Sequence, residues 1–295
     1  MAESVDCRPS LGRRPVYGPG VDRLPLLREV DRRLGLLDAL NAAIFDPRCP
    51  WLIEHDQRTI LAQRVFALAA GYEDLNDHQA LRHDTLFQAL TDRVLKAGQT
   101  ETDALSSPST LCRLENRITR GDLARLAAVH GRQEGRFFHG YYDHYCFLPL
   151  YVTCGQQLLV AYLRPANLDG EAQTLYDDLY CQRGEAENRI KDQQLGCFAD
   201  RTSCHDFLSN QFRVLLSAAA YVLVETLRRV GLAGTELAAA QVGTIRLKLL
   251  KIGGRIVRSV RRLVIHLASG YPLQRTFQTI LERLQEWRCR PTRVP

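Results

Sequence analysis

The sequence predicts an α+β protein that is mostly helical, with one small sheet between helical N- and C-terminal regions. Three observations lead to this fold class. Apolar residues recur every three or four positions over most of the chain, which is the period of an amphipathic helix. Residues 136–163 are instead rich in aromatic side chains, which favour strands. The 295 residues are 45% apolar, which is enough to bury a core, and the length suggests about two domains.

The first 128 residues divide into an arm and a helical region. Residues 1–23 are rich in Pro, Gly and Arg, which predicts a flexible arm. The region 24–128 has the apolar period of several helices, with Gly71 as a stop signal and Asp84 as an N-cap. The expected helices are residues 24–40, residues 59–70, two short ones near Leu81 and Phe87, and residues 111–129. Short helices with tight turns fit a DNA-binding unit, and they fit any other helical domain equally well.

Residues 129–212 carry the expected sheet. Three antiparallel strands are predicted near 136–146, 148–153 and 157–163, with Cys154-Gly155-Gln156 as a hairpin turn. The remaining residues, 213–295, predict a helical C-terminal region. Within it, residues 255–272 partly alternate apolar and basic side chains, which fits either a strand or a helix.

Charge, cysteine content and hydropathy indicate the cellular compartment and the kind of partner. There are 39 Lys and Arg against 33 Asp and Glu, a net charge of +6, and Arg is well suited to phosphate. The nine Cys form no CxxC motif and are expected to be reduced thiols; Cys197, Cys204 and His205 lack a second ligand pair for zinc. No apolar run reaches the roughly 18 residues of a membrane span, Val214–Val224 being the longest candidate, and no secretory signal is found. We expect a cytoplasmic protein without a membrane partner.

The most specific local pattern is Tyr180, Arg183 and Glu187. On a helix these residues fall at positions i, i+3 and i+7, which lie on one face. A carboxylate beside a guanidinium and a phenol suits a surface that binds a metal ion and faces phosphate. The alternative is an exposed helix with an ordinary Arg–Glu pair one turn apart, which is a common arrangement.

Six stretches of the chain resemble bacterial insertion-sequence transposases of the DDE class. They are LAQRVFALAAGYEDLNDHQALRHD, SSPSTLCRLENR, HGRQEGRFFHGYYDHYCFLPLYVTCG, LYDDLYCQRGEAENRIKDQQLG, FADRTSCHDFLSNQFRVLLSAAAYVL and IRLKLLKIGGRIVRSVRRLVIHLAS. The resemblance implies a ribonuclease-H-like catalytic domain, reduced here to three antiparallel strands plus helices over residues 129–212. It also implies a helical DNA-binding region at 24–128 and an enzyme that cleaves and joins DNA. The implied partners are double-stranded transposon ends and a second copy in a homodimer, at the nucleoid of the bacterial cytoplasm.

The resemblance assigns Glu187 as a catalytic carboxylate and Mg²⁺ ligand, with Tyr180 and Arg183 as its companions. Transposases of this class hold two Mg²⁺ ions between three carboxylates. The signature commonly continues with a Lys two turns later, where this sequence has Gln194, with Lys191 nearby.

The other two carboxylates of the family have no counterpart in this chain. In the family, one Asp lies on a strand just before the HGRQEG stretch, and the second lies in a Gly-Asp-Ser strand end. Here the helix that contains Asp122 runs directly into HGRQEG, and no Gly-Asp-Ser occurs. Asp143 and Asp169 match neither position. We therefore expect an internally deleted, catalytically inactive transposase. The alternatives are a non-catalytic DNA-binding remnant that interferes with full-length transposase, and a decayed product that folds poorly.

A basic stretch without acidic residues lies near the C-terminus. Its members are Arg246, Lys248, Lys251, Arg255, Arg258, Arg261 and Arg262. Like charges beside alternating apolar residues can line a surface for backbone phosphates, which predicts DNA binding. The alternative is the solvated face of a structural helix.

Overall fold

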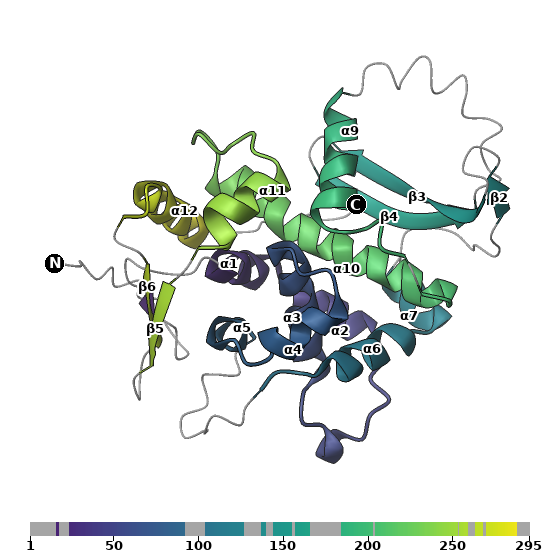
Figure 1. Cartoon of the computed structure of the whole chain (residues 1–295). Helices are drawn as coiled ribbons and strands as arrows, with labels where there is room; N and C mark the ends of the chain where they lie inside the picture. The colour runs from purple at the N-terminus through teal and green to yellow at the C-terminus, as the bar shows by residue number, and fades with distance from the viewer. Residues whose placement is uncertain are drawn as a thin grey trace.

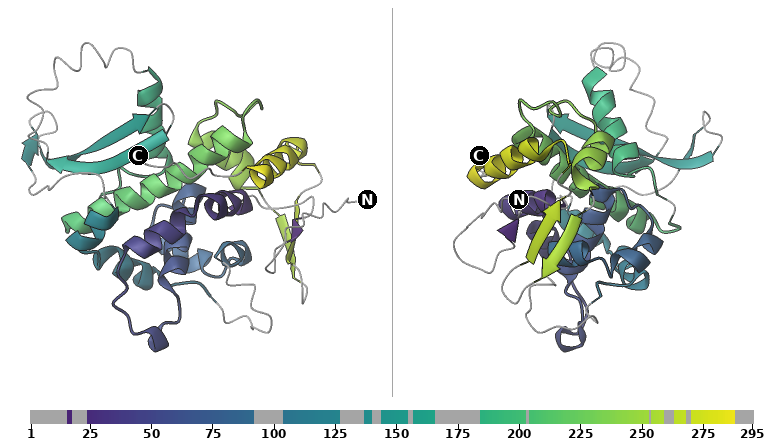
Figure 2. Two further views of the ribbon diagram at one scale, coloured as in Figure 1. Left: turned by 180° about the vertical axis from the view of Figure 1, so that it is seen from behind. Right: turned by 60° about the vertical axis from the view of Figure 1, so that its left-hand side comes forward.

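The computed structural model describes residues 16–17, 24–91, 104–126, 137–139, 144–154, 157–165, 184–202, 204–252, 254–258, 263–267 and 270–287. This part of the protein is mostly helical, as the sequence predicts. The long helix α10 (Phe207–Thr226) crosses the molecule (Figure 1). The N-terminal helices lie on one side of α10, and the strands β3 and β4 with helix α9 lie on the other, which both views of Figure 2 also show.

The N-terminal helices begin and end at local signals that the sequence carries. They are α1 (Leu24–Leu34), α2 (Leu36–Ala43), η1 (Pro50–Leu52), α3 (Gln57–Ala70), η2 (Leu75–Asp77), α4 (His78–Leu81), α5 (Thr85–Leu90), α6 (Pro108–Asn116) and α7 (Arg120–Leu126). The Asp84 side chain accepts from the backbone N–H groups of Leu86 and Phe87, so the predicted N-cap is confirmed. Gly71 ends α3 with φ 91°, a conformation that suits glycine.

Two of the expected helices are each divided in two. Gly35, with φ 68°, separates α1 from α2. The helix expected at 111–129 is broken between α6 and α7 by a reciprocal cap. Thr119 Oγ1 accepts from the backbone N–H of Asp122 at 3.2 Å, and the Asp122 carboxylate accepts from the backbone N–H of Thr119 at 2.9 Å. The capping pair Thr119-x-x-Asp122 is visible in the sequence, and it starts a new helix.

The predicted antiparallel hairpin is present, with different bounds. Strand β3 (His144–Cys154) pairs with β4 (Gln157–Pro165), and the pairing extends to Cys154 opposite Gln157. The short strand β2 (Phe137–His139) joins β3 on its other edge, so the order is β2-β3-β4. Strand β4 packs against α10.

A second sheet corrects the expectation of a wholly helical C-terminal region. Strands β5 (Gly254–Arg258) and β6 (Leu263–Leu267) form an antiparallel hairpin, which decides between the two interpretations of this segment. Strand β1 (Val16–Tyr17), within the arm expected to be flexible, pairs in parallel with β6. β-branched residues in β5 and β6 favour this outcome over a helix.

Helices from both ends of the chain share one buried apolar cluster. Phe66 of α3, Phe212 and Leu216 of α10, and Ile280 of α12 (Gln274–Glu286) all belong to it. The predicted regions 24–128 and 213–295 therefore contribute to a common core. The remaining helical elements are α9 (Gly184–Lys191), η6 (Asp192–Gly196), η7 (Leu227–Gly231), α11 (Val242–Ile245) and η8 (Arg246–Leu250).

The sequence predicted no membrane span, but one helix among the described residues is long and apolar enough to cross a membrane, judged by length and composition alone. It spans Phe207–Gly231 and contains the run Val214–Val224. Within the protein, 67% of this window is buried. A buried core helix meets the same criteria, so the segment is weak evidence for a membrane.

Candidate functional site

Of the three residues of the predicted site, the structure describes the backbone of Glu187. Glu187 is within α9, whose backbone is helical from Gly184 to Lys191. Tyr180 and Arg183 fall outside the described residues, and so do Asp143 and Asp169. The helical backbone at Glu187 agrees with the predicted helix. The common face of the three residues stays a prediction.

A buried ion network holds the end of this helix. Asp192, the first residue after α9, accepts a hydrogen bond from Arg228 Nη1 at 3.1 Å and one from the backbone N–H of Val242 at 3.2 Å. Arg228 is 2% exposed, and its Nε donates to Glu225 Oε2 at 2.9 Å. Its Nη1 also donates to the carbonyl of Ala240 at 3.1 Å. One guanidinium thus connects η6, which follows α9 directly, with α10 and the segment before α11.

The ionisable groups of this network are buried, and burial shifts their pKa values. Burial raises the pKa of Glu225 above its usual range, although the Arg228 guanidinium opposes this shift. Burial likewise raises the pKa of Tyr221. Within the described part of the chain, Tyr221 Oη and Glu225 Oε1 have no hydrogen-bond partner. Arg189 of α9 acts electrostatically on both groups, which places the α9 helix beside them.

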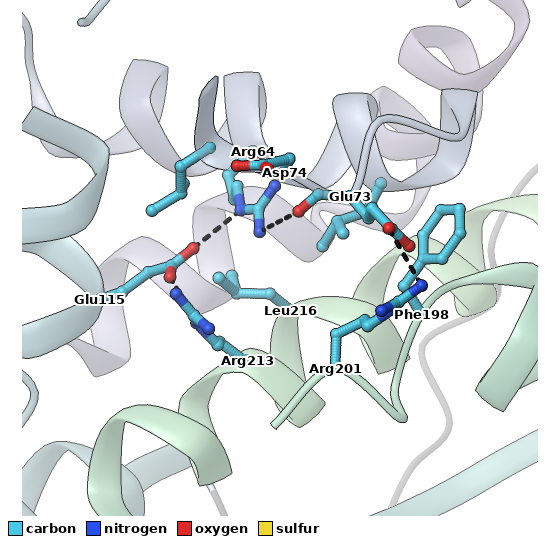
Figure 3. Close-up of a pocket in the computed structure, with 10 residues that line it drawn as sticks. Arg64, Glu73, Asp74, Glu115, Phe198, Arg201, Arg213 and Leu216 are labelled. Carbon is cyan, nitrogen blue, oxygen red and sulfur yellow. Dashed lines mark hydrogen bonds and ion pairs between the residues drawn. The ribbon is translucent and has the colours of Figure 1, made fainter. Parts of the chain in front are cut away.

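A second group of charges lines a pocket of about 250 Å³ between α3, α6 and α10 (Figure 3). The Glu115 carboxylate is 1% exposed and bridges two cations there. It accepts from Arg64 Nε at 2.8 Å and from Arg213 Nε at 2.7 Å. Arg201 forms an ion pair with Glu73 at 3.2 Å on the rim. The pocket contains three arginines and three acids, so its formal charge is balanced.

Sequence reasoning missed both charge groups. Arg64, Glu115 and Arg213 are 51 and 98 residues apart along the chain. No local spacing connects such residues, and only a three-dimensional structure brings them together. Asp192 carried a weak signal, since it follows the Glu187 helix directly.

The basic stretch is divided among several elements. Arg246 lies in η8, where its guanidinium contacts other parts of the protein. Its Nε donates to the carbonyl of Ala69 at 3.0 Å, and its Nη2 donates to the carbonyl of Gly196. The guanidinium also lies 5.4 Å from the ring centre of Phe198. A cation beside the last carbonyls of α3 stabilises that helix end. Arg246 therefore links η8 to the end of α3 and to η6 within the protein.

The other members of the basic stretch differ in what the structure describes. Lys248 and Lys251 are exposed, and Lys251 Nζ lies 4.2 Å from the ring centre of Tyr72. Arg255 and Arg258 lie on β5. Arg261 and Arg262 fall outside the described residues.

The described residues do not supply a metal site. No group of three His, Cys, Asp or Glu side chains among them is arranged to hold a metal ion. Burial raises the pKa of Cys197 to about 12, which disfavours a thiolate and gives no support to a zinc site with Cys204. Asp122 is committed to the backbone N–H groups of Phe45 and Thr119, which is a structural role.

Comparison with models of protein families shows which family the chain belongs to. The family model described as Transposase DDE domain, group 1, matches residues 24–129, 124–171 and 166–289. The chain therefore belongs to this family of DDE transposases, as the resemblance implied. Members of the family generally use a divalent metal ion and act on DNA. No curated protein and no solved structure matches the chain.

Proposed function

We propose that this chain is a DNA transposase by descent which retains DNA binding and has lost DNA cleavage. The observation that carries this proposal is the division of the family match into three segments. They meet at residues 124–129 and 166–171. These are the two places where the family's first and second catalytic Asp segments would have to stand. Internal deletion at both joins accounts for the missing carboxylates.

The loss of cleavage follows from the number of metal ligands. Two-metal DNA cleavage needs several carboxylates that converge on the reacting phosphate. Of the three carboxylates of the family signature, the sequence matches one, Glu187. The described residues contribute no further group that fits a divalent ion, so no catalytic step is assigned to such an ion here.

The retained activity is binding to double-stranded transposon ends. We assign it to the helical region 24–128 together with six residues of the basic stretch: Lys248, Lys251, Arg255, Arg258, Arg261 and Arg262. Arg246 is left out, because carbonyl oxygens within the protein occupy its guanidinium. Six phosphate contacts would give a slope of log K against log salt on the order of −5.

Binding without cleavage gives the protein a regulatory consequence in a cell that contains an intact copy. The chain would occupy the same transposon ends, or mix with full-length subunits, and so reduce transposition. This activity belongs in the bacterial cytoplasm, at the nucleoid.

The test uses a duplex that carries the terminal repeats flanking this reading frame. A mobility-shift titration should show binding that weakens steeply between low and physiological salt. Incubation of the same duplex with Mg²⁺ should leave it intact. Absence of binding at low salt would overturn the retained function, and cleavage would overturn the lost one.

A further inference from the structure

The pocket between α3, α6 and α10 has a size and a lining that fit a small ligand. Its volume of about 250 Å³ lies just below the roughly 300–1,000 Å³ of common small-molecule sites, so a small metabolite fits and a DNA duplex does not. Six of its ten lining residues are charged. The other four are apolar: Leu68, Leu75, Phe198 and Leu216. The arrangement of the charges decides which ligand fits.

The part of the pocket around Glu115 has an excess of positive charge. The Glu115 carboxylate accepts from Arg64 Nε at 2.8 Å and from Arg213 Nε at 2.7 Å, so two guanidinium groups share one carboxylate. Arg64 Nη2 also donates to the carbonyl of Glu73 at 2.9 Å. Within the described part of the chain, the two Nη groups of Arg213 have no hydrogen-bond partner. This planar fork is therefore available to a ligand carboxylate.

Negative charge prevails where the segment after α3 meets the segment after η6. Glu73 forms its ion pair with Arg201 there, and the neighbouring Asp74 adds a second carboxylate. Asp74 is exposed, and its Oδ1 accepts from the backbone N–H of Asn76 at 2.8 Å. Its Oδ2 has no hydrogen-bond partner among the described residues, so it can accept from a ligand cation. Two carboxylates against one guanidinium leave one negative charge in this part of the pocket.

The two charge groups lie on different sides of the pocket, with apolar side chains near them. Figure 3 shows Glu115 and Arg213 on one side, and Arg201 with Phe198 on the other. Phe198 has a φ of 62°, a left-handed conformation that residues with a side chain rarely adopt. Backbone strain of this kind is retained mainly at functional sites. Leu216 is 1% exposed and adds a rigid apolar surface.

We propose that this pocket binds a free α-amino acid with an apolar side chain. The ligand's carboxylate accepts hydrogen bonds from the two Nη groups of Arg213, and its ammonium group donates to Asp74 Oδ2. Its side chain packs against Phe198 and Leu216. A zwitterion carries one charge of each sign and so compensates both local excesses, which an anion such as phosphate does not. The inference does not depend on DNA binding, so either can hold when the other fails.

Calorimetric titration of the full chain with L-leucine and with L-phenylalanine tests the proposal. At least one of the two should bind and raise Tm, by roughly 5–10 °C at one hundred times its dissociation constant. The N-acetyl derivative of that amino acid lacks the ammonium charge, and its amide lacks the carboxylate. Each derivative should bind at least tenfold more weakly than the amino acid itself. Inorganic phosphate should not displace the amino acid.

Two substitutions test the two charged ends separately. Arg213→Lys keeps a cation beside Glu115 and removes the fork, and Asp74→Asn removes the charge and keeps a side chain that can cap Asn76. Each should weaken the dissociation constant of the amino acid at least tenfold. The matched control is Asp84→Asn, which makes the same change at the N-cap of α5, outside the pocket, and should leave that constant unchanged.

Three results would overturn the proposal. The first is the absence of binding with either amino acid at about 10 mM, which exceeds the dissociation constant of a weak millimolar site tenfold. The second is binding that either pocket variant leaves unchanged, or that the N-acetyl and amide derivatives reproduce. The third is displacement of the amino acid by phosphate, which would make the pocket a site for anions. The derivatives test the charges without any substitution, so the proposal stays testable even where Arg213→Lys does not fold.

Discussion

Replacing Arg228 by Met tests whether the buried ion network holds the α9 helix in place. Arg228 is 2% exposed and contacts Asp192 at 3.1 Å and Glu225 at 2.8 Å. Methionine keeps much of the apolar stem of arginine and removes the charge. Two carboxylates then remain in the interior without their ion-pair partner.

The expected loss in the free energy of unfolding follows from this burial of two carboxylates. Breaking a buried ion pair by removing one partner costs about 3–5 kcal/mol, because the remaining charge is uncompensated. For a chain of this size each kcal/mol lowers Tm by about 2–4 °C, so Tm should fall by roughly 6–20 °C. Adding Glu225→Gln to Arg228→Met should recover part of the loss, because one of the two buried carboxylates becomes neutral.

The loss of stability in Arg228→Met should depend on pH. Burial already raises the folded-state pKa of Glu225 above its unfolded value, and loss of the guanidinium raises it further. Such a group stabilises the fold below the unfolded pKa, and that contribution is lost as pH rises through the folded pKa. The Tm deficit of Arg228→Met should therefore be smaller at acidic pH than at pH 8. Calorimetry on both proteins measures it. A deficit below about 1 kcal/mol, or one independent of pH, would refute the argument.

Three further predictions concern stability and binding. His78 is fully buried and its pKa is lowered to about 3 by desolvation, so between the unfolded value of 6.5 and about 3 only the unfolded chain binds the proton. The free energy of unfolding should thus fall as pH drops through that window, by up to about 1.4 kcal/mol per pH unit. Urea titrations at several pH values should show that His78→Gln flattens this pH dependence. An unchanged pH dependence in His78→Gln would contradict the prediction. Gly71→Ala should cost about 1–2 kcal/mol, because φ is 91° and the new Cβ would lie 2.8 Å from Arg246 Cδ; an unchanged Tm would contradict this. Lys248→Ala with Lys251→Ala should reduce the salt slope of DNA binding by about 2, and an unaltered slope would remove these residues from the proposed surface.

The sequence predicted those features that depend on local signals. The Asp84 cap, the Gly71 stop and the β3–β4 hairpin follow from a few neighbouring residues, and the structure contains all three. Where two local signals competed, the sequence predicted the helix boundaries wrongly. The apolar period suggested one helix through residues 111–129, whereas the Thr119–Asp122 capping pair divides it.

Long-range pairing lay beyond the reach of sequence patterns. Arg246 looked like one member of a basic surface, yet it donates to carbonyls of Ala69 and Gly196. Glu115 falls within the helix expected at 111–129, and nothing in that pattern indicates that it forms ion pairs with Arg64 and Arg213 of two other helices. Such partners are far apart along the chain, and no spacing rule relates them. The family, in contrast, could be recognised from the sequence, because long stretches carry it together.

The most direct test of the central claim is a nicking assay on the duplex with the flanking terminal repeats, in Mg²⁺ and under conditions where the mobility shift shows the duplex bound. The intact protein and Glu187→Gln should both bind the duplex and both leave it uncut. Cleavage by the intact protein that Glu187→Gln abolishes would contradict the account, because it would show a working catalytic site built on Glu187.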